Sequence, residues 1–171
     1  HSNTDPGAVN GSDREADIAQ DIRNIVASIL RDDYGLTVRT DGEGKGNLPL
    51  REAVKLIRGS DVAIEFHTNA AASKAATGVE ALSTPKNKRW CQVLSRAVAD
   101  ATGWKLRGDG GFKPDNAGQH SRLAYVQAGG IVFEPFFISN DADLKLFKER
   151  KWAICRAIAT AIAMEVGAAL V

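Results

Sequence analysis

The sequence lacks the features that mark several large classes of protein. Its 22 Lys and Arg stand against 21 Asp and Glu, and the formal net charge of +1 gives no strong footprint for a polyanion. We therefore expect no nucleic-acid partner. No uninterrupted apolar run is long enough to span a bilayer, and the apolar C-terminal segment carries Arg156 and Glu165, so we expect a core helix there. No signal peptide is visible in the sequence.

Cysteine is also scarce. The two cysteines, Cys91 and Cys155, lie inside helical patterns and lack the spacing of a metal-binding or redox pair, which favours buried free thiols over a disulfide. The glycine-rich segment 41–47 lacks the spacing and the Lys-Ser/Thr pair of a phosphate-binding loop, so we interpret it as a surface loop. No internal repeat or second domain is evident, which leaves one domain over residues 1–171.

Periodic patterns predict the fold class. Amphipathic helices are predicted at 12–30, with Ser12 as N-cap, at 90–101, and from Asn140 or Asp141 onwards, with shorter helices at 48–58 and 122–127. Strands are predicted at 36–40, 61–67, 78–82 and 131–134, and segment 108–118 is predicted to be a long loop. This alternation predicts a single-domain α/β fold with a twisted, mostly parallel sheet flanked by helices on both faces.

Four separated fragments carry the residues best suited to chemistry. They contribute His1, Glu15, His67 and Glu134. Two imidazoles and one carboxylate make a three-ligand zinc set that leaves a position for water. A further carboxylate can then handle the proton. Because sites in α/β sheets collect where strand ends meet loops, the strand-end positions of His67 and Glu134 favour one shared site.

Two of these residues have a plainer interpretation. A lone histidine at a strand end, such as His67, is more often a satisfied polar residue than a ligand. Glu15 fits a capping box with Ser12, in which its carboxylate would bind the N–H of the cap residue. Glu15 also lies three residues before Ile18, however, which directs it towards the buried face and suits a ligand as well.

The other two residues leave alternatives open. Glu134 lies inside the apolar run 131–138, where burial is costly unless the carboxylate is paired or functional, and where desolvation would raise its pKa. Its plain alternative is a structural, salt-bridged glutamate. His1 could be the remnant of an affinity tag. It could also form a copper histidine brace with its α-amino group and ring, with His67 as third ligand, although that chemistry normally sits on an all-β sandwich.

In this order, the fragments resemble the zinc-dependent N-acetylmuramoyl-L-alanine amidases of the type 3 family. HSNTDPGAVNG is similar to the family's His-containing, glycine-rich turn, and Glu15 opens a helix as the family's glutamate ligand does. EFHTNAA resembles the stretch around its second histidine, Gly78-Val79-Glu80 resembles its Gly-x-Glu strand, and segment 132–140 resembles its last glutamate-bearing strand. The resemblance covers nearly the whole chain.

The chain departs from the family pattern at three places. Glu65 stands where the family usually has a small serine, which would add an acid near the metal. Pro135-Phe136 replaces a small residue and a glycine after the catalytic glutamate. The family's first strand is expected before His1, and without it the neighbouring ladders would be unpaired.

The resemblance implies hydrolysis of the amide between N-acetylmuramic acid and L-alanine in peptidoglycan. It implies Zn²⁺ held by His1, Glu15 and His67, with Glu134 as the catalytic acid–base. Candidate substrate contacts are Asn69, Glu65, Glu80 and His120, together with the loop 108–118. A monomer of this kind would act on the bacterial cell wall, in the periplasm, after secretion or after phage lysis. It would be either a bacterial wall-remodelling enzyme or a bacteriolytic phage endolysin, and a catalytically silent peptidoglycan-binding domain is the alternative in another class.

Overall fold

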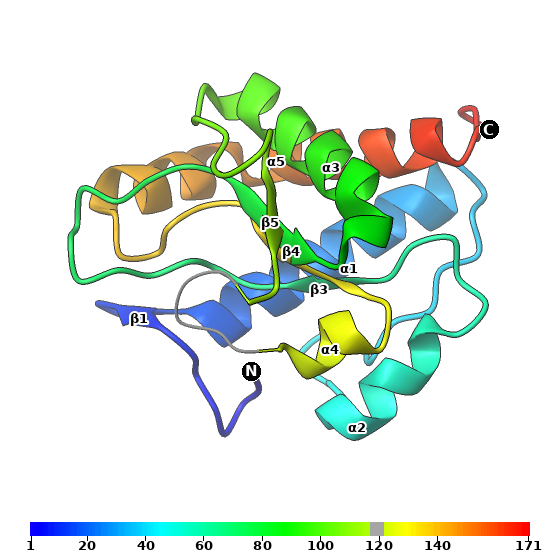
Figure 1. The fold of residues 1–171 in the computed structure, drawn as a ribbon, viewed down its shortest axis with the longest axis horizontal. Helices are drawn as coiled ribbons and strands as arrows, with labels where there is room; N and C mark the ends of the chain where they lie inside the picture. Colours follow the sequence, from blue (N-terminus) through cyan, green and yellow to red (C-terminus); the bar gives the residue numbers. More distant parts are fainter. Residues whose placement is uncertain (117–121) are drawn as a thin grey trace.

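A four-stranded mixed sheet with helices on both faces forms the framework of the computed structural model, which describes residues 1–116 and 122–171 (Figure 1). The strands are β1 (Val9–Asn10), β2 (Asp13–Arg14), β3 (Ile64–Phe66), β4 (Glu80–Ser83), β5 (Phe112–Pro114) and β6 (Ile131–Glu134). The α-helices are α1 (Glu15–Asp32), α2 (Leu50–Ala53), α3 (Lys88–Thr102), α4 (Ala124–Gln127) and α5 (Asp141–Glu165), with 3₁₀ turns η1 (Val54–Ile57) and η2 (Pro85–Asn87). The predicted single-domain α/β fold is confirmed.

The main sheet has the strand order β3-β6-β4-β5. The pairs β3–β6 and β4–β5 are parallel, whereas β4 and β6 run antiparallel, so the sheet is mostly parallel but mixed. Within the described residues β3 pairs only with β6 and therefore lies at an edge of the sheet. The strand expected before residue 1 stays a prediction.

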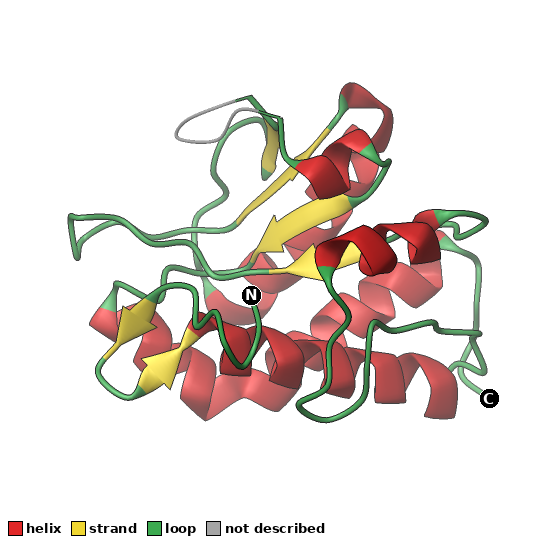
Figure 2. Cartoon of the chain, turned by 90° about the horizontal axis from the view of Figure 1, so that it is seen from below, coloured by secondary structure: helices red, strands yellow, loops and turns green. Residues whose placement is uncertain are grey.

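Each face of the sheet has its own apolar cluster. Helices α1, α3 and α5 pack together over one face, and their apolar residues join Ile131 and Phe133 of β6 in the large core. On the other face, Leu82 and Val132 form a small cluster with Tyr125 and Val126 of α4. Figure 2 shows these helices on either side of the sheet.

The alternation of side chains along the strands decides which face carries the polar residues. In β6, Phe133 faces the large core while Val132 faces the small cluster, so Glu134 lies on the small-cluster side. The same alternation puts Glu80 of β4 and His67, just after β3, on that side. Because β3 and β6 end where β4 begins, these residues meet at one edge of the sheet.

The long predicted helices are confirmed. Helix α3 ends at Gly103, whose φ of 81° is the left-handed conformation that lets its N–H bond to the carbonyl of Ala99. Helix α5 begins after Asn140, whose side-chain oxygen accepts hydrogen bonds from the backbone N–H groups of Ala142 and Asp143. The N-cap is therefore Asn140, one of the two residues predicted for this position.

Three local predictions were wrong. Ser12 does not cap α1, which begins at Glu15 with Arg14 as N-cap and no side-chain cap bond. Segment 36–40 is irregular and pairs with no strand. Its alternation of apolar and polar residues arises because Leu36 and Val38 pack on the large core. The predicted loop 108–118 contains β5, which forms by pairing with β4. The glycines that precede this strand made the segment look like a loop.

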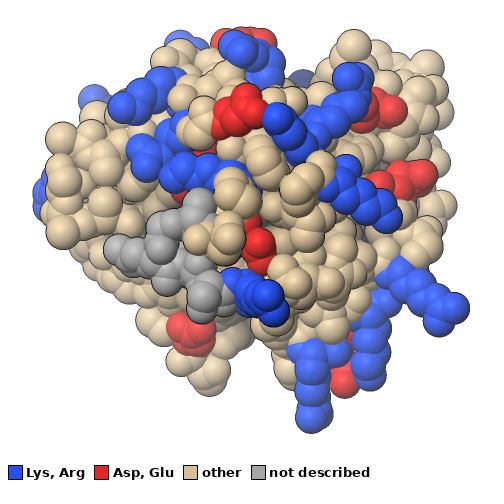
Figure 3. All heavy atoms as spheres, viewed as in Figure 1, with Lys and Arg blue, Asp and Glu red and all other residues tan. Residues whose placement is uncertain are grey.

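The remaining predictions concern the state of the cysteines, membrane-spanning helices and the distribution of charge on the surface. Cys91 and Cys155 are free and buried, as expected. Among the helices of the described residues, none combines the length and the apolar character needed to cross a membrane. On the face drawn in Figure 3, Lys and Arg side chains lie in small groups separated by uncharged and acidic atoms. This distribution agrees with the small net charge.

Candidate active site

Glu15 is the buried centre of the candidate site. It is the first residue of α1 and is only 4% exposed. Its Oε2 accepts a hydrogen bond from the N–H of Ala8 at 2.9 Å, and its Oε1 accepts one from the N–H of Thr68 at 3.0 Å. The carboxylate thus ties the N-terminal segment to the chain leaving β3. The capping-box interpretation is wrong, because the side chain reaches these two groups and not Ser12.

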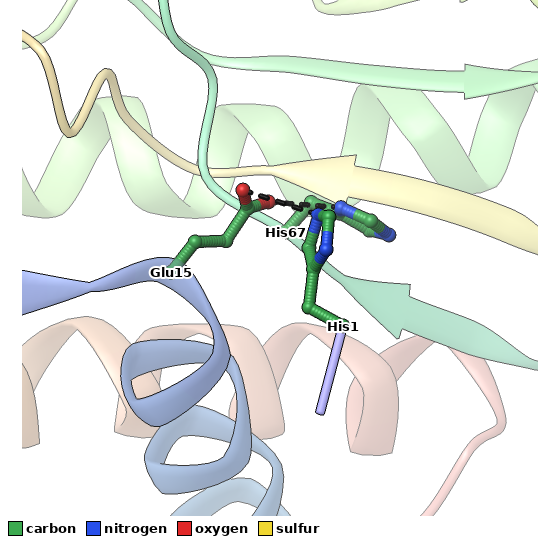
Figure 4. Close-up of side chains that lie close together, drawn as sticks. All are labelled: His1, Glu15 and His67. Carbon is green, nitrogen blue, oxygen red and sulfur yellow. Dashed lines mark hydrogen bonds and ion pairs between the residues drawn. The ribbon is translucent and has the colours of Figure 1, made fainter. Parts of the chain in front are cut away.

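Two histidines converge on this carboxylate (Figure 4). The Nε2 atom of His1 lies 3.2 Å from Oε2 of Glu15, and the Nδ1 atom of His67 lies 2.9 Å from Oε1. The two imidazole rings meet edge to face, with centroids 5.1 Å apart. One nitrogen of each ring and one oxygen of Glu15 all lie within 4.8 Å of one another. The structure therefore brings together the three residues predicted as ligands.

The donor set fits a zinc ion. A tetrahedral ion with ligand distances of about 2.0–2.2 Å spaces its ligand atoms by about 3.3–3.5 Å, so the three donors need to move little to surround one. The second nitrogen of each ring faces a carboxylate: His1 Nδ1 lies 3.0 Å from Asp5, and His67 Nε2 lies 3.6 Å from Glu65. Carboxylates in this position fix the ring tautomer and raise the basicity of ligating histidines.

The electrostatics of the three residues also favour a bound cation. Burial works against ionisation of Glu15, but hydrogen bonds from His1, His67 and the N–H of Ala8 lower its pKa. The hydrogen bond to Glu15 raises the pKa of His1. Burial opposes charge on His67, yet Glu15 and Glu65 raise its pKa to about 10. Protons held on these rings take the place that a metal ion would occupy.

A second wall of the site is built by two carboxyl groups on adjacent strands. Glu134 and Glu80 are register partners across the antiparallel β6–β4 pair, and both are buried. Oε2 of Glu80 accepts a hydrogen bond from Arg107 and forms an ion pair with Nζ of Lys113 at 3.0 Å. Burial, and then the negative charge of Glu80, raise the pKa of Glu134 to about 8. Burial opposes ionisation of Glu80, but its two cationic partners lower its pKa.

One open cavity joins the two walls. The side chains that line it include those of His1, Asp5, Glu15, Glu65, His67, Asn69, Glu80, Arg107, Lys113 and Glu134. The cluster of His1, Glu15 and His67, a buried carboxyl group and open space thus meet at the strand ends. With a metal ion bound, such an arrangement could polarise a carbonyl and move a proton beside it.

Other predicted site residues have different surroundings. Asn69 lines the cavity. Its side-chain oxygen accepts a hydrogen bond from the N–H of Ala70, and its backbone pairs with Phe136 and Ile138. Glu65 approaches His67, and Glu80 lies beside Glu134. His120 falls outside the described residues.

Two site residues, Asp5 and Arg107, were missed in the sequence, and Lys113 was indicated only as part of the candidate substrate loop 108–118. Asp5 lies four residues after His1 in a tight turn, so the short spacing of an imidazole and a carboxylate was an available signal. Arg107 had no such signal, and nothing singled out Lys113 within its loop, because the approach of both residues to Glu80 depends on the pairing of β4 with β5.

Comparison with known proteins shows the family. The family model described as N-acetylmuramoyl-L-alanine amidase matches residues 1–164. The crystal structure of a protein from Neisseria meningitidis, provisionally described as an N-acetylmuramoyl-L-alanine amidase, is 85% identical, with a TM-score of 0.96 over 100% of this chain and 94% of that one. A search of curated proteins gives no significant match.

Two more distant structures share the fold. One is the catalytic domain of CwlV, an N-acetylmuramoyl-L-alanine amidase from Bacillus (Paenibacillus) polymyxa var. colistinus, with 22% identity and a TM-score of 0.82 over 97% of this chain and 93% of that one. The other is the N-acetylmuramoyl-L-alanine amidase AmiC2 of Nostoc punctiforme, with 18% identity and a TM-score of 0.83 over 97% of this chain and 92% of that one.

Proposed function

Because the chain belongs to the N-acetylmuramoyl-L-alanine amidase family, we propose that it hydrolyses, with zinc, the amide between N-acetylmuramic acid and L-alanine in peptidoglycan. The observation that carries the zinc dependence is the convergence of His1, Glu15 and His67 within 4.8 Å of one another. Two imidazoles and one carboxylate are the ligand set of catalytic zinc sites that keep one position open.

The roles of the chain's own residues follow from their positions. His1 Nε2, His67 Nδ1 and the Glu15 carboxylate would hold the ion, while Asp5 and Glu65 would orient the two imidazoles. A zinc ion bound there would polarise the amide carbonyl and lower the pKa of the attacking water. Glu15 contributes one negative charge, so the bound group would keep a net positive charge towards the carbonyl.

Glu134 is the proposed acid–base. It lines the cavity beside His67 at the end of β6, and its pKa of about 8 suits a group that must both accept and return a proton near neutral pH. It would take a proton from the attacking water and then deliver it to the departing amine of L-alanine. Glu80, held by Arg107 and Lys113, would stay ionised beside it.

The setting of the reaction is the bacterial cell wall. Peptidoglycan lies outside the cytoplasmic membrane, so we propose extracytoplasmic action. The 85% identity to a protein of Neisseria meningitidis favours a bacterial wall-remodelling enzyme over a phage endolysin. The copper-brace alternative lacks its all-β framework, since this chain has a mixed sheet between helices.

Digestion of purified peptidoglycan tests the reaction. The zinc-loaded enzyme should release new L-alanine amino groups, detected by dinitrophenylation and hydrolysis, without new reducing sugar ends. The Glu134→Gln variant, which keeps the side-chain shape, is the matched control for contaminating activity. Reducing ends in place of amino groups would reject the amidase assignment, and binding to peptidoglycan without any cleavage would support the silent binding domain.

A further inference from the structure

We propose that Arg107 and Lys113 bind the free carboxylate of the peptide stem next to the scissile amide and make the enzyme selective for acidic stems. This inference rests on the proposed amidase function and specifies the substrate chemistry of the same cavity. It would make the two residues specificity determinants as well as partners of Glu80.

The fold directs both cations to the cavity wall next to Glu134. Lys113 is the middle residue of β5 and is the register partner of Leu82, so it faces the same side of the sheet as Glu80. Arg107 precedes β5 and donates to the same oxygen of Glu80. The two side chains remain 29% and 26% exposed and line the cavity together with Glu134. They therefore reach the buried carboxylate and the open space at once.

The charges of this wall do not balance. Two cations, Arg107 and Lys113, contact the single carboxylate of Glu80. The guanidinium of Arg107 is also held in place, since it lies over the ring of Phe137 at 4.8 Å and donates to the carbonyl of Thr77 at 3.3 Å. A fixed guanidinium beside an ammonium group is well suited to bind a further carboxylate.

Two other cations lining the cavity, Arg23 and Arg39, are occupied elsewhere. Arg23 pairs with Asp41 at 2.8 Å and donates to carbonyls of Gly44 and Gly46. Arg39 donates to the carbonyl of Arg58 at 2.8 Å. These contacts are with loop segments away from β4 and β6. A positive charge beside the proposed acid–base thus comes, in the described part of the chain, from Arg107 and Lys113.

The chemistry of the substrate identifies the group that these cations would meet. The muramic acid side of the amide carries no charge. On the other side, L-alanine is followed by a γ-linked D-glutamate whose α-carboxylate is free in acidic stems and is an amide in amidated ones. This group lies about one residue, or about 3.5 Å of extended chain, beyond L-alanine. Register partners such as Glu80 and Glu134 have Cβ atoms about 5 Å apart, so the reach is adequate.

The test compares two substrates that differ only in this group. We would measure kcat/KM for N-acetylmuramoyl-L-alanyl-D-glutamate and for the corresponding D-isoglutamine compound, which carries an amide in place of the α-carboxylate. The parent should prefer the acidic substrate by about tenfold, mainly through KM, and added salt should reduce the preference. Lys113→Gln keeps a donor for Glu80 but removes the charge, and it should bring the preference to within about twofold. Lys145→Gln, on the exposed side of α5, is the matched control that should keep the preference.

A binding measurement separates this inference from the proposed function. Calorimetry with the free dipeptides L-alanyl-D-glutamate and L-alanyl-D-isoglutamine requires no catalysis. A preference for the acidic dipeptide that Lys113→Gln abolishes would support the inference even if neither muramoyl substrate were cleaved, an outcome that would instead count against the amidase assignment. Equal binding and equal kcat/KM for the two forms in the parent would overturn the inference. So would an equal loss for both forms in Lys113→Gln, because that result indicates a purely structural ion pair.

Discussion

The two walls of the cavity differ in the partners that they provide for buried carboxylates. In the first, which we call the imidazole wall, Glu15 lies between His1 and His67, and no Lys or Arg in the described ranges forms an ion pair with it. In the second, the carboxyl wall, Glu80 and Glu134 face each other, and Glu80 is paired with two cations. Glutamate therefore has two proposed roles in one cavity: Glu15 as a metal ligand and Glu134 as a group that binds and releases a proton.

The difference shows what determines the role of a glutamate. Glu15 is compensated by the protons on His1 and His67, whose pKa values it raises. When those protons leave, its negative charge is uncompensated, and a divalent cation would complete the group. Arg107 and Lys113 already compensate Glu80, and the remaining carboxyl group of Glu134 is then forced towards its protonated form by burial and by its neighbour. Changing residues on one wall should thus affect metal binding, and changing residues on the other should affect proton transfer.

The largest expected effect is the loss of turnover in Glu134→Gln, which tests the carboxyl wall separately from the imidazole wall. This change keeps the side-chain shape but removes the base, so turnover should fall by about 10²–10⁴-fold while zinc content and thermal stability stay close to those of the parent. Steady-state kinetics and metal analysis on one preparation would measure both. A variant within a few-fold of the parent rate would mean that another group, such as Glu65, moves the proton.

The reciprocal change on the imidazole wall is Glu15→Gln. The neutral amide is a poorer ligand than the carboxylate, so zinc affinity should fall. The loss should exceed the about 10–100-fold that follows from removing a residue that only orients a metal ligand. Competition with a chromogenic chelator would measure it. Full zinc affinity together with full activity in this variant would show that Glu15 only organises the backbone at Ala8 and Thr68.

A smaller effect is expected behind the imidazole wall, at Asp5. Asp5→Asn replaces the carboxylate 3.0 Å from Nδ1 of His1, which should weaken zinc binding by about tenfold because Asp5 is largely exposed. The same chelator competition would report it, and Asp17→Asn at the start of α1 is a control outside the site. An unchanged zinc affinity would remove Asp5 from the metal site.

The smallest expected effect is a shift in pH dependence on the carboxyl wall. Glu134 must be ionised to act as base, so kcat/KM should fall as the pH drops through its pKa. Glu80→Gln removes a neighbouring negative charge and lowers the pKa of Glu134, which should move this acid limb to lower pH by less than about one unit, because burial is the larger cause. A shift to higher pH in the measured profile would contradict the proposed coupling.

The sequence predicted the parts of the fold that depend on local periodicity. Helices α1, α3 and α5 and strands β3, β4 and β6 follow patterns of 3.6 or two residues. Strand β5 and the β1–β2 hairpin were missed because each is two or three residues long and depends on its pairing partner. The capping-box pattern around Glu15 was misleading for the same reason, since a group 53 residues away accounts for one of its bonds.

The site residues were found mainly through the order of motifs. Spacing alone could not indicate that His1, Glu15 and His67 would meet, because the fold of α1 against the end of β3 brings them together. Family resemblance supplied that long-range information. It gave no role to Asp5 or Arg107 and indicated Lys113 only as part of the candidate substrate loop 108–118. The contacts of these residues appear only in the three-dimensional arrangement.

The most direct test of the imidazole wall as a metal site is the zinc content of the purified protein, measured by mass spectrometry of the native protein together with elemental analysis. We predict about one zinc per chain in the parent and in Glu134→Gln, and its loss in His67→Ala, since a catalytic zinc needs all three protein ligands. Copper in place of zinc, or zinc binding unaffected by His67→Ala, would contradict the assignment of the imidazole wall as the metal site.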